Sequence, residues 1–259
     1  MARHVDVWMD GVRLADIGGV LLQQVTESPP EMEVTYGARP IRSGRDILTD
    51  KRQALQVSIT LVIRELFDLI KRNAILQALV AWASGSVLEL SNHPGQILYV
   101  RCKSFPSLGE VRNYAAEIKI DLEAAEIPFW VEKIPVSITK TASQTGSLSL
   151  FVPGTALTPV NVSCVTNGNL SDFSLAVSSS GTSKTITLAG MTGLSAGSVV
   201  DLKNDAKDRF LIVNGATSLL RYRSMLSADD LMVPPGNVTL NWSMNISGTL
   251  TVTAAGRWL

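Results

Sequence analysis

The stretch from residue 44 to residue 102 constrains the fold most, because its hydrophobic period changes from that of a strand to that of a helix and back. An alternating segment comes first, and its apolar face consists of Leu55, Val57, Ile59, Leu61 and Ile63. A stripe with a helical period follows, made of Leu66, Leu69, Ile70, Leu76, Leu79 and Val80. We expect the helix to end at residues 82–85, with Gly85 in a left-handed cap.

Two short strands are predicted directly after this helix, at Val87–Ser91 and Ile97–Cys102, separated by a turn at residues 92–95. A long strand, one helix and two closely spaced strands form a β-rich unit and not a βαβ dinucleotide-binding domain. Nothing in the block supplies catalytic chemistry. We therefore interpret it as a scaffold.

Length and charge limit the classes of partner. At 259 residues the chain can form one large or two ordinary domains. Lys plus Arg and Asp plus Glu each number 23, so no net charge attracts nucleic acid or acidic lipid. No apolar run approaches the roughly 20 residues that span a bilayer, and the N-terminus lacks the apolar core of a secretory signal. We expect no membrane partner and no specific nucleic-acid binding.

The cysteines and histidines are few and scattered. Cys102 and Cys164 lie far apart in the sequence, so we interpret them as small buried apolar residues, in a chain that is made in a reducing cytoplasm or was not selected for disulfides. His4 and His93 have no second histidine or cysteine near them, and a metal site needs clustered ligands. We expect no metal and no cofactor.

The composition changes near residue 140. Most charged side chains lie before this point, whereas serine and threonine replace them after it. The small polar run at residues 141–146 suits a short linker, so we predict two domains, residues 1–140 and 147–259. The second half has many short strand-like runs separated by turns such as Asn214-Gly215. Strands at this spacing without helices are typical of an antiparallel sandwich or jelly roll.

Several motifs are carried in a particular order along both halves. In the first half they are the strand–helix block, Trp82, residues 88–91, Pro94 and residues 127–130. In the second half they are residues 154–159, 194–201, 213–215, 235–237 and 256–259. In order and spacing they resemble the distal tail protein (Dit) family of long-tailed bacteriophages, over nearly the whole chain.

The resemblance implies a fold and a function. The fold class would be mainly β: an N-terminal β-sandwich or barrel-like ring domain with one helix, and a C-terminal galectin-like antiparallel β-sandwich. Proteins of the family form a hexameric ring at the distal end of the tail in the virion. The ring joins the tail tube protein and the tape measure protein to the tail-tip protein that carries host recognition. The long inserted carbohydrate-binding modules of some relatives have no counterpart in this chain.

The strongest enzyme signal is the G-x-S-x-G pattern at residues 193–197. A nucleophile elbow needs a strand–turn–helix setting and a histidine that follows the serine, whereas His4 and His93 both precede Ser195. Carboxylate neighbours such as Asp229 and Asp230 are more often solvated charge than an acid–base pair. We expect no catalytic residues.

The densest basic cluster consists of Arg39, Arg42, Arg45, Lys51 and Arg52. We consider three interpretations: an arm at residues 31–45 that reaches a neighbouring subunit, a rim that faces passing DNA, and a solvated loop. No aromatic residues interleave with the charges, which disfavours base stacking. The cluster is the candidate subunit interface.

A carbohydrate-binding module is the alternative function, because sandwiches of this class often hold saccharides on one face. Such sites usually stack a sugar on an exposed aromatic ring. Trp242 alternates like a core residue, so Trp258 and Tyr222 remain as candidates for sugar stacking.

Overall fold

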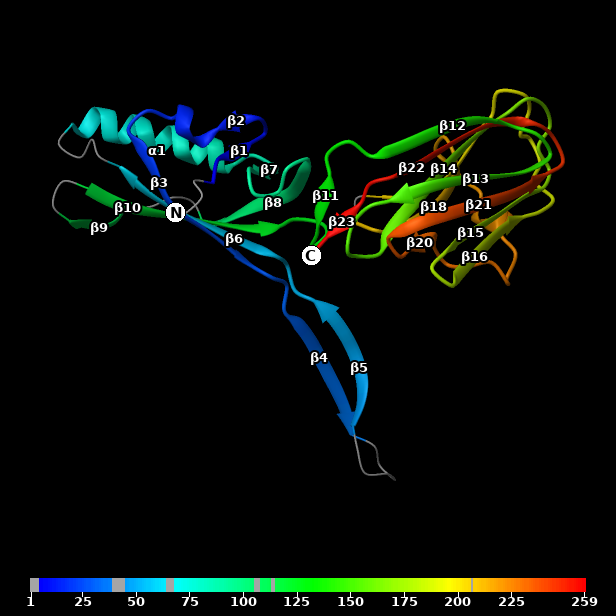
Figure 1. The fold of residues 1–259 in the computed structure, drawn as a ribbon, viewed down its shortest axis with the longest axis horizontal. Helices are drawn as coiled ribbons and strands as arrows, with labels where there is room; N and C mark the ends of the chain where they lie inside the picture. Colours follow the sequence, from blue (N-terminus) through cyan, green and yellow to red (C-terminus); the bar gives the residue numbers. More distant parts are fainter. Residues whose placement is uncertain (1–4, 39–44, 64–67, 105–107, 113–114, 206) are drawn as a thin grey trace. The chain divides into compact units, whose positions relative to one another are not determined.

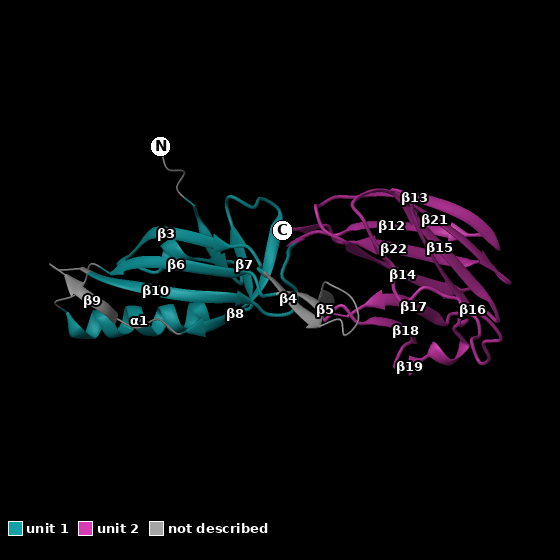
Figure 2. Ribbon diagram, turned by 90° about the horizontal axis from the view of Figure 1, so that it is seen from below, with its two compact units in different colours: residues 1–130, 259 teal, residues 131–258 magenta. Residues whose placement is uncertain are grey.

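The computed structural model describes residues 5–38, 45–63, 68–104, 108–112, 115–205 and 207–259. The chain is mainly β, and its described residues contain a single α-helix (Figure 1). It divides into two compact units, residues 1–130 with Leu259 and residues 131–258 (Figure 2). The mainly β fold class predicted from the sequence is confirmed.

One antiparallel sheet forms the body of the first unit, with the strand order β2-β1-β7-β8-β10-β6-β3 and with β9 paired to β10. The strands are β1 (Val7–Met9), β2 (Val12–Arg13), β3 (Val20–Ser28), β6 (Gln56–Ile63), β7 (Val87–Leu90), β8 (Gln96–Ser104), β9 (Leu108–Arg112) and β10 (Ala115–Ala124). The α-helix α1 (Leu69–Ala83) covers one face of this sheet (Figure 1).

The central strands β6 and β10 bury the apolar face that the alternation predicts. In β6, every second residue from Val57 to Ile63 is fully buried. The register sets Ile59 opposite Ile120 and Leu61 opposite Ile118, so the two strands present one continuous apolar surface. Each large side chain buried in this way stabilises the fold by roughly 1.5–3 kcal/mol.

Helix α1 ends within the predicted residues 82–85, but its C-terminal cap differs from the prediction. Asp68 caps its N-terminus by accepting hydrogen bonds from the backbone N–H groups of Ile70 and Lys71, at 3.0 and 3.1 Å. Its C-cap is Ser84 in a right-handed conformation, so the left-handed cap predicted at Gly85 is wrong. Glycine is required at position 85 for another reason: a Cβ there would lie 2.3 Å from Cγ of Met9.

The packed face of α1 agrees with the predicted stripe only in part, at Leu79, which is fully buried. The buried residues are Leu79, Trp82 and Ala83. Of the predicted stripe, Leu69 and Ile70 are 61% and 83% exposed, and Leu66 lies outside the described residues. The helix is apolar on more than one side, so its hydrophobic period could not identify the side that packs.

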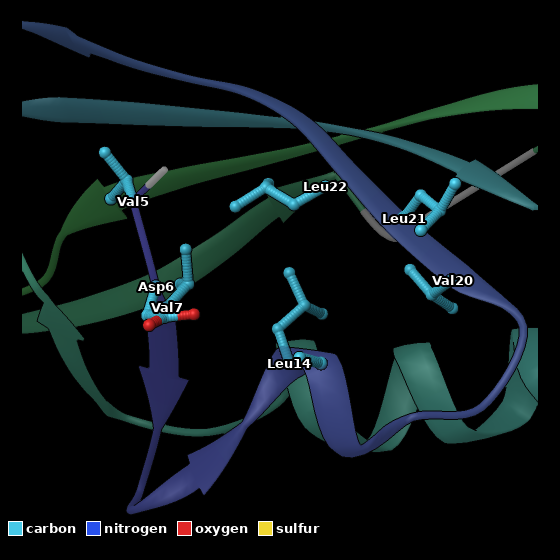
Figure 3. A pocket seen from close by; sticks show the side chains of 8 residues that line it. Val5, Asp6, Val7, Leu14, Val20, Leu21 and Leu22 are labelled. Atoms are coloured by element: carbon cyan, nitrogen blue, oxygen red, sulfur yellow. The ribbon is translucent and has the colours of Figure 1, made fainter. Parts of the chain in front are cut away.

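The sheet of the first unit curls until its two ends face a common cavity. The cavity measures about 270 Å³ and lies between residues 5–7 on one side and residues 20–22 on the other (Figure 3). Leu14 of the short helix η1 (Leu14–Asp16) also lines it. This geometry corresponds to an incompletely closed barrel.

The second unit is a sandwich of two antiparallel sheets (Figure 2). The larger sheet has the order β12-β22-β14-β17-β18-β19, with β20 on β14, and the smaller has the order β13-β21-β15-β16. The strands are β12 (Val136–Ala142), β13 (Thr145–Val152), β14 (Thr158–Thr166), β15 (Phe173–Ser179), β16 (Thr182–Leu188), β17 (Val199–Asn204), β18 (Phe210–Asn214), β19 (Thr217–Ser218), β20 (Met232–Val233), β21 (Gly236–Met244) and β22 (Gly248–Ala254). The antiparallel sandwich predicted for this half is confirmed, with its core between the sheets.

The segment predicted as a linker, residues 141–146, instead contains the end of β12, the turn that leads from the larger sheet to the smaller one, and the start of β13. Ala142 is fully buried, and the indole Nε1 of Trp242 donates a hydrogen bond to the carbonyl of Ser143 at 3.0 Å. A Cβ at Gly146 would lie 2.4 Å from the Trp242 ring, so glycine lets the ring pack there. The small residues that suggested a linker instead make room for a buried tryptophan. The division between the units follows Trp130.

The last strand of the chain, β23, has both a backbone partner and a buried side-chain ion pair. Strand β11 (Trp130–Glu132) meets β23 (Arg257–Trp258), and the Glu132 N–H donates to the carbonyl of Gly256 at 2.9 Å. The Arg257 side chain is buried and forms a bidentate pair with Asp208, with one contact at 2.7 Å.

Candidate interaction surfaces

The segment predicted as an arm belongs to a β-hairpin, whose register shifts between Thr35 and Tyr36. Strands β4 (Met32–Ala38) and β5 (Arg45–Arg52) pair from Met32 opposite Arg52 to Ala38 opposite Arg45. The Gln53 N–H donates to the carbonyl of Glu31 at 2.8 Å and extends the ladder. The alternation of residues 32–36, Met-Glu-Val-Thr-Tyr, is the strand signal that the nearby charges obscured.

This hairpin pairs with no other strand among the described residues. An isolated two-stranded hairpin is at best marginally stable in water. Because it cannot bury a core of its own, a hairpin of this length is a natural surface for contact with another chain.

The basic cluster is spread along the hairpin. Arg45 begins β5, whereas Lys51 and Arg52 end it. Since a strand rises about 3.3 Å per residue, Arg45 lies roughly 20 Å from Lys51 and Arg52. Arg39 and Arg42 lie outside the described residues, as do the side chains of Arg45, Lys51 and Arg52. The backbone register therefore puts the basic positions at opposite ends of β5 and does not gather them in one patch.

A second surface of the first unit is the outward side of α1. Beside Leu69 and Ile70, the small residues Ala74, Ala78 and Ala81 are exposed. Ile70, Ala74 and Ala78 are spaced four residues apart and so share one side of the helix. An apolar helix side is normally buried, yet the described part of the chain leaves this one open.

The two aromatic candidates for sugar stacking do not form one site. The Tyr222 hydroxyl lies 3.1 Å from Oγ1 of Thr192, and the Arg221 guanidinium lies 4.6 Å from the tyrosine ring centroid. The hydrogen bond with Thr192 and the nearby Arg221 lower the pKa of Tyr222 below its usual value. One ring face is thus occupied by a cation.

Trp258 lies elsewhere on the second unit. It is the second residue of β23, after Arg257. Arg257 forms a β-bridge with Gly154, which lies just beyond the Val152 end of β13. The carbonyl of Tyr222 instead accepts from the N–H of Ala189, beyond the Leu188 end of β16. Val152 and Leu188 mark opposite ends of the smaller sheet. Val152 pairs with Gly236, the first residue of β21. Leu188 pairs with Phe173, which in turn pairs with Met244, the last residue of β21.

The glycine–serine pattern at residues 193–197 forms a turn that leads into β17, as predicted. The carbonyl of Ser195 accepts from Oγ1 of Thr166 at 2.8 Å and from the N–H of Ser198 at 3.0 Å. No helix follows the serine, so the geometry lacks the strand–turn–helix setting of a nucleophile elbow.

The other polar groups that suggested chemistry have structural partners. Asp229 pairs with Arg223, and Asp230 pairs with Lys184. His93 lies in the β7–β8 turn, and its Nε2 lies 2.9 Å from Oε2 of Glu27. Within the described residues, no group of three His, Cys, Asp or Glu side chains has the arrangement of a metal site. No described helix is long and apolar enough to span a membrane.

Comparison with known proteins identifies the fold. No protein-family model matches the chain, and no curated protein matches it significantly. Among solved structures it is similar to the SPP1 Dit protein (gp 19.1), described as a paradigm of the hub adsorption apparatus in phages that infect Gram-positive bacteria. The identity is 15% and the TM-score 0.69, over 99% of this chain and 100% of that chain.

Two further matches are chains of the phage P2 baseplate in its activated conformation. The calcium form gives 10% identity and a TM-score of 0.40, over 98% of each chain. The strontium form gives 11% identity and a TM-score of 0.40, over 96% of this chain and 97% of that chain. The similarity to SPP1 Dit confirms the resemblance to the distal tail fold.

Proposed function

We propose that this chain, which has the fold of a phage distal tail protein, is a structural hub at the distal end of a phage tail. It acts through protein–protein contacts, as a homo-oligomeric ring, which we expect to be hexameric. The ring would join the tail tube protein and the tape measure protein to the tail-tip protein in the virion. The observation that carries this proposal is the match to SPP1 Dit across both units.

The first unit is our candidate for the ring-forming domain. A closed ring needs a heterologous interface, in which one patch on a subunit fits a different patch on the next. A stable interface also needs about 1,000 Å² or more of buried surface. The unpaired hairpin β4–β5 and the open apolar side of α1 are two such unlike surfaces on one unit. We assign Arg39, Arg42, Arg45, Lys51 and Arg52 to the subunit contact.

The second unit is our candidate for the galectin-like outer domain. Its core is closed between its own two sheets, so it has no need of a partner to complete it. We propose no catalytic role for either unit, since the one serine motif with an enzymatic pattern forms a turn.

Negative-stain images of the purified full chain test the hub proposal. Closed rings of uniform diameter support it. Single compact particles at every protein concentration would reject it.

Carbohydrate binding is the second candidate function. The separation of Tyr222 from Trp258 removes the stacking site first considered for it. One specific observation nevertheless favours it: the larger sheet of the sandwich has a hollow on its outer face, and most of the β14, β17 and β22 residues that line it carry a polar group.

A further inference from the structure

The outer face of the larger sheet carries polar side chains that lie directly opposite one another. In the first row, Thr139 of β12, Thr251 of β22, Ser163 of β14 and Asp201 of β17 face each other across four strands. In the second row, Ser137, Thr253 and Asn161 are similarly aligned. Their sequence neighbours, such as Val162 and Val252, are buried in the core, so these side chains point away from it.

This polar face is hollowed where β14, β17 and β22 lie side by side. A cavity of about 210 Å³ is lined there by Asn161, Val162, Ser163, Asp201, Lys203, Asn204, Thr251 and Thr253. Thr139 on the neighbouring β12 is exposed, whereas Thr251, Ser163 and Asp201 are half-buried. The side chains of the hollow are therefore recessed and not simply spread over a flat sheet.

The hollow holds both hydrogen-bond donors and acceptors. Lys203 Nζ lies 3.2 Å from Oδ2 of Asp201, so the two charges compensate each other. The backbone N–H of Asn204 donates a hydrogen bond to Oδ1 of Asn161 at 2.9 Å, and its side-chain Nδ2 donates one to the carbonyl of Asp208 at 3.2 Å. These contacts hold Asn204 in place, and Asp201 and Lys203 supply the outward-facing acceptor and donor of the hollow.

This combination selects one class of ligand. A sugar hydroxyl both donates and accepts, which matches a carboxylate, an ammonium, amides and hydroxyls set close together. The Asp201 carboxylate disfavours an anion, and a single carboxylate already paired with lysine is a poor cation site. The volume is below the roughly 300–1,000 Å³ of common ligand pockets, so it suits one sugar ring and not a long oligosaccharide.

We propose that the hollow on β14, β17 and β22 is a binding site for a neutral monosaccharide unit. Asp201 accepts from sugar hydroxyls, Lys203 donates to them, and Ser163 and Thr251 complete the contacts. The inference deepens the carbohydrate-binding alternative and does not depend on the hub role. A chain that forms rings but binds no sugar would contradict the inference alone, whereas a sugar-binding monomer would contradict the hub role alone.

Saturation-transfer NMR on the full chain tests the proposal, with glucose, galactose, N-acetylglucosamine and rhamnose as probes. We expect the wild-type chain to transfer saturation to the proton signals of at least one of these sugars. Asp201→Ala should weaken its binding roughly tenfold or more, because it removes a charged acceptor. Thr251→Val keeps the β-branched shape and should weaken binding several-fold.

Thr239→Val is the matched control. Thr239 also lies on an outer sheet face and pairs with a hydroxyl, that of Ser149 at 3.3 Å, but on the smaller sheet. Its substitution should leave the saturation signal unchanged. The proposal is overturned if none of the four sugars receives saturation, or if the signal persists in both Asp201→Ala and Thr251→Val. A loss equal in all three variants would also overturn it.

Discussion

His93 stacks against Trp130, with 4.2 Å between ring centroids and 12° between ring planes. The Glu27 carboxylate fixes both rings: His93 Nε2 lies 2.9 Å from Oε2, and Trp130 Nε1 donates to the same oxygen at 3.2 Å. Asn92 Nδ2 donates to Oε1 of Glu27 at 2.9 Å. This cluster joins the β7–β8 turn, strand β3 and the last residue before the boundary between the units.

Glu27→Ala should lower the free energy of unfolding of the first unit by about 1–3 kcal/mol, because it leaves partly buried donors without an acceptor. Urea unfolding followed by tryptophan fluorescence measures the change. Glu117→Ala, on the exposed side of β10, is the control and should change stability by less than about 0.5 kcal/mol. Equal effects of the two substitutions would contradict a structural role for the cluster.

Arg257→Met should destabilise the second unit by about 3 kcal/mol, because it leaves Asp208 without its buried partner. Thermal unfolding measures the shift. Arg209→Met is the matched control: Arg209 pairs with Asp205 but its side chain is 72% exposed, so about 0–1 kcal/mol is expected. The double variant Asp208→Ala with Arg257→Met should cost less than the sum of the two single changes. Strict additivity would argue against a direct pair.

Burial raises the pKa of the Cys164 thiol to about 11. The unfolded chain then ionises this thiol first, so its contribution to stability is complete below about pH 9 and is lost as the pH rises towards 11. Cys164→Ala should be less stable than wild type at pH 7, and this difference should shrink by about 2–3 kcal/mol near pH 11. Urea unfolding of both proteins between pH 7 and pH 11 measures it. A constant difference would contradict the expected protonation state.

The position of the boundary leads to a prediction about truncated chains. Residues 131–259 should fold alone, because they retain β12, which pairs with β22 over seven residues. Residues 147–259 lose β12 and the carbonyl of Ser143, the acceptor of the Trp242 indole, so they should not give a cooperative thermal transition. Circular dichroism melts compare the two chains. If both chains unfold with equally cooperative transitions, β12 is not needed for the second unit to fold, and the domain would begin at residue 147.

The strongest sequence signals were those of buried alternating strands. The pattern from Val57 to Ile63 predicts β6 correctly, because period two has a single apolar face. The packed side of α1 could not be predicted in the same way, because the helix is apolar on more than one side. The run at residues 141–146 resembles a linker because its residues are small and polar. They are small because Trp242, about 100 residues later in the sequence, lies against Gly146, and this contact cannot be predicted from the local sequence.

The proposed interaction surfaces were only partly predictable. The position of the arm followed from its charges, but its hairpin structure follows from pairing between β4 and β5, which composition does not reveal. The hollow on the larger sheet was not predicted at all. Its residues come from three strands, and their alignment depends on the cross-strand register of β22, β14 and β17.

The hairpin is the part of the molecule to remove in testing assembly. Because the Gln53 N–H bonds to the carbonyl of Glu31, residues 32–52 can be replaced by an Asn-Gly turn without separating β3 from β6. The double variant Met225→Ser with Leu226→Ser is the control, since both side chains are fully or almost fully exposed on the second unit. It should leave assembly unchanged.

Light scattering of the full chain and the hairpin-deleted chain, at matched concentrations, tests the central claim most directly. The account predicts a closed assembly of several 27.9 kDa subunits for the full chain, and folded monomers after deletion. A full chain that stays at 27.9 kDa at every concentration would contradict the ring. A deleted chain that keeps the full assembly would place the interface outside the hairpin.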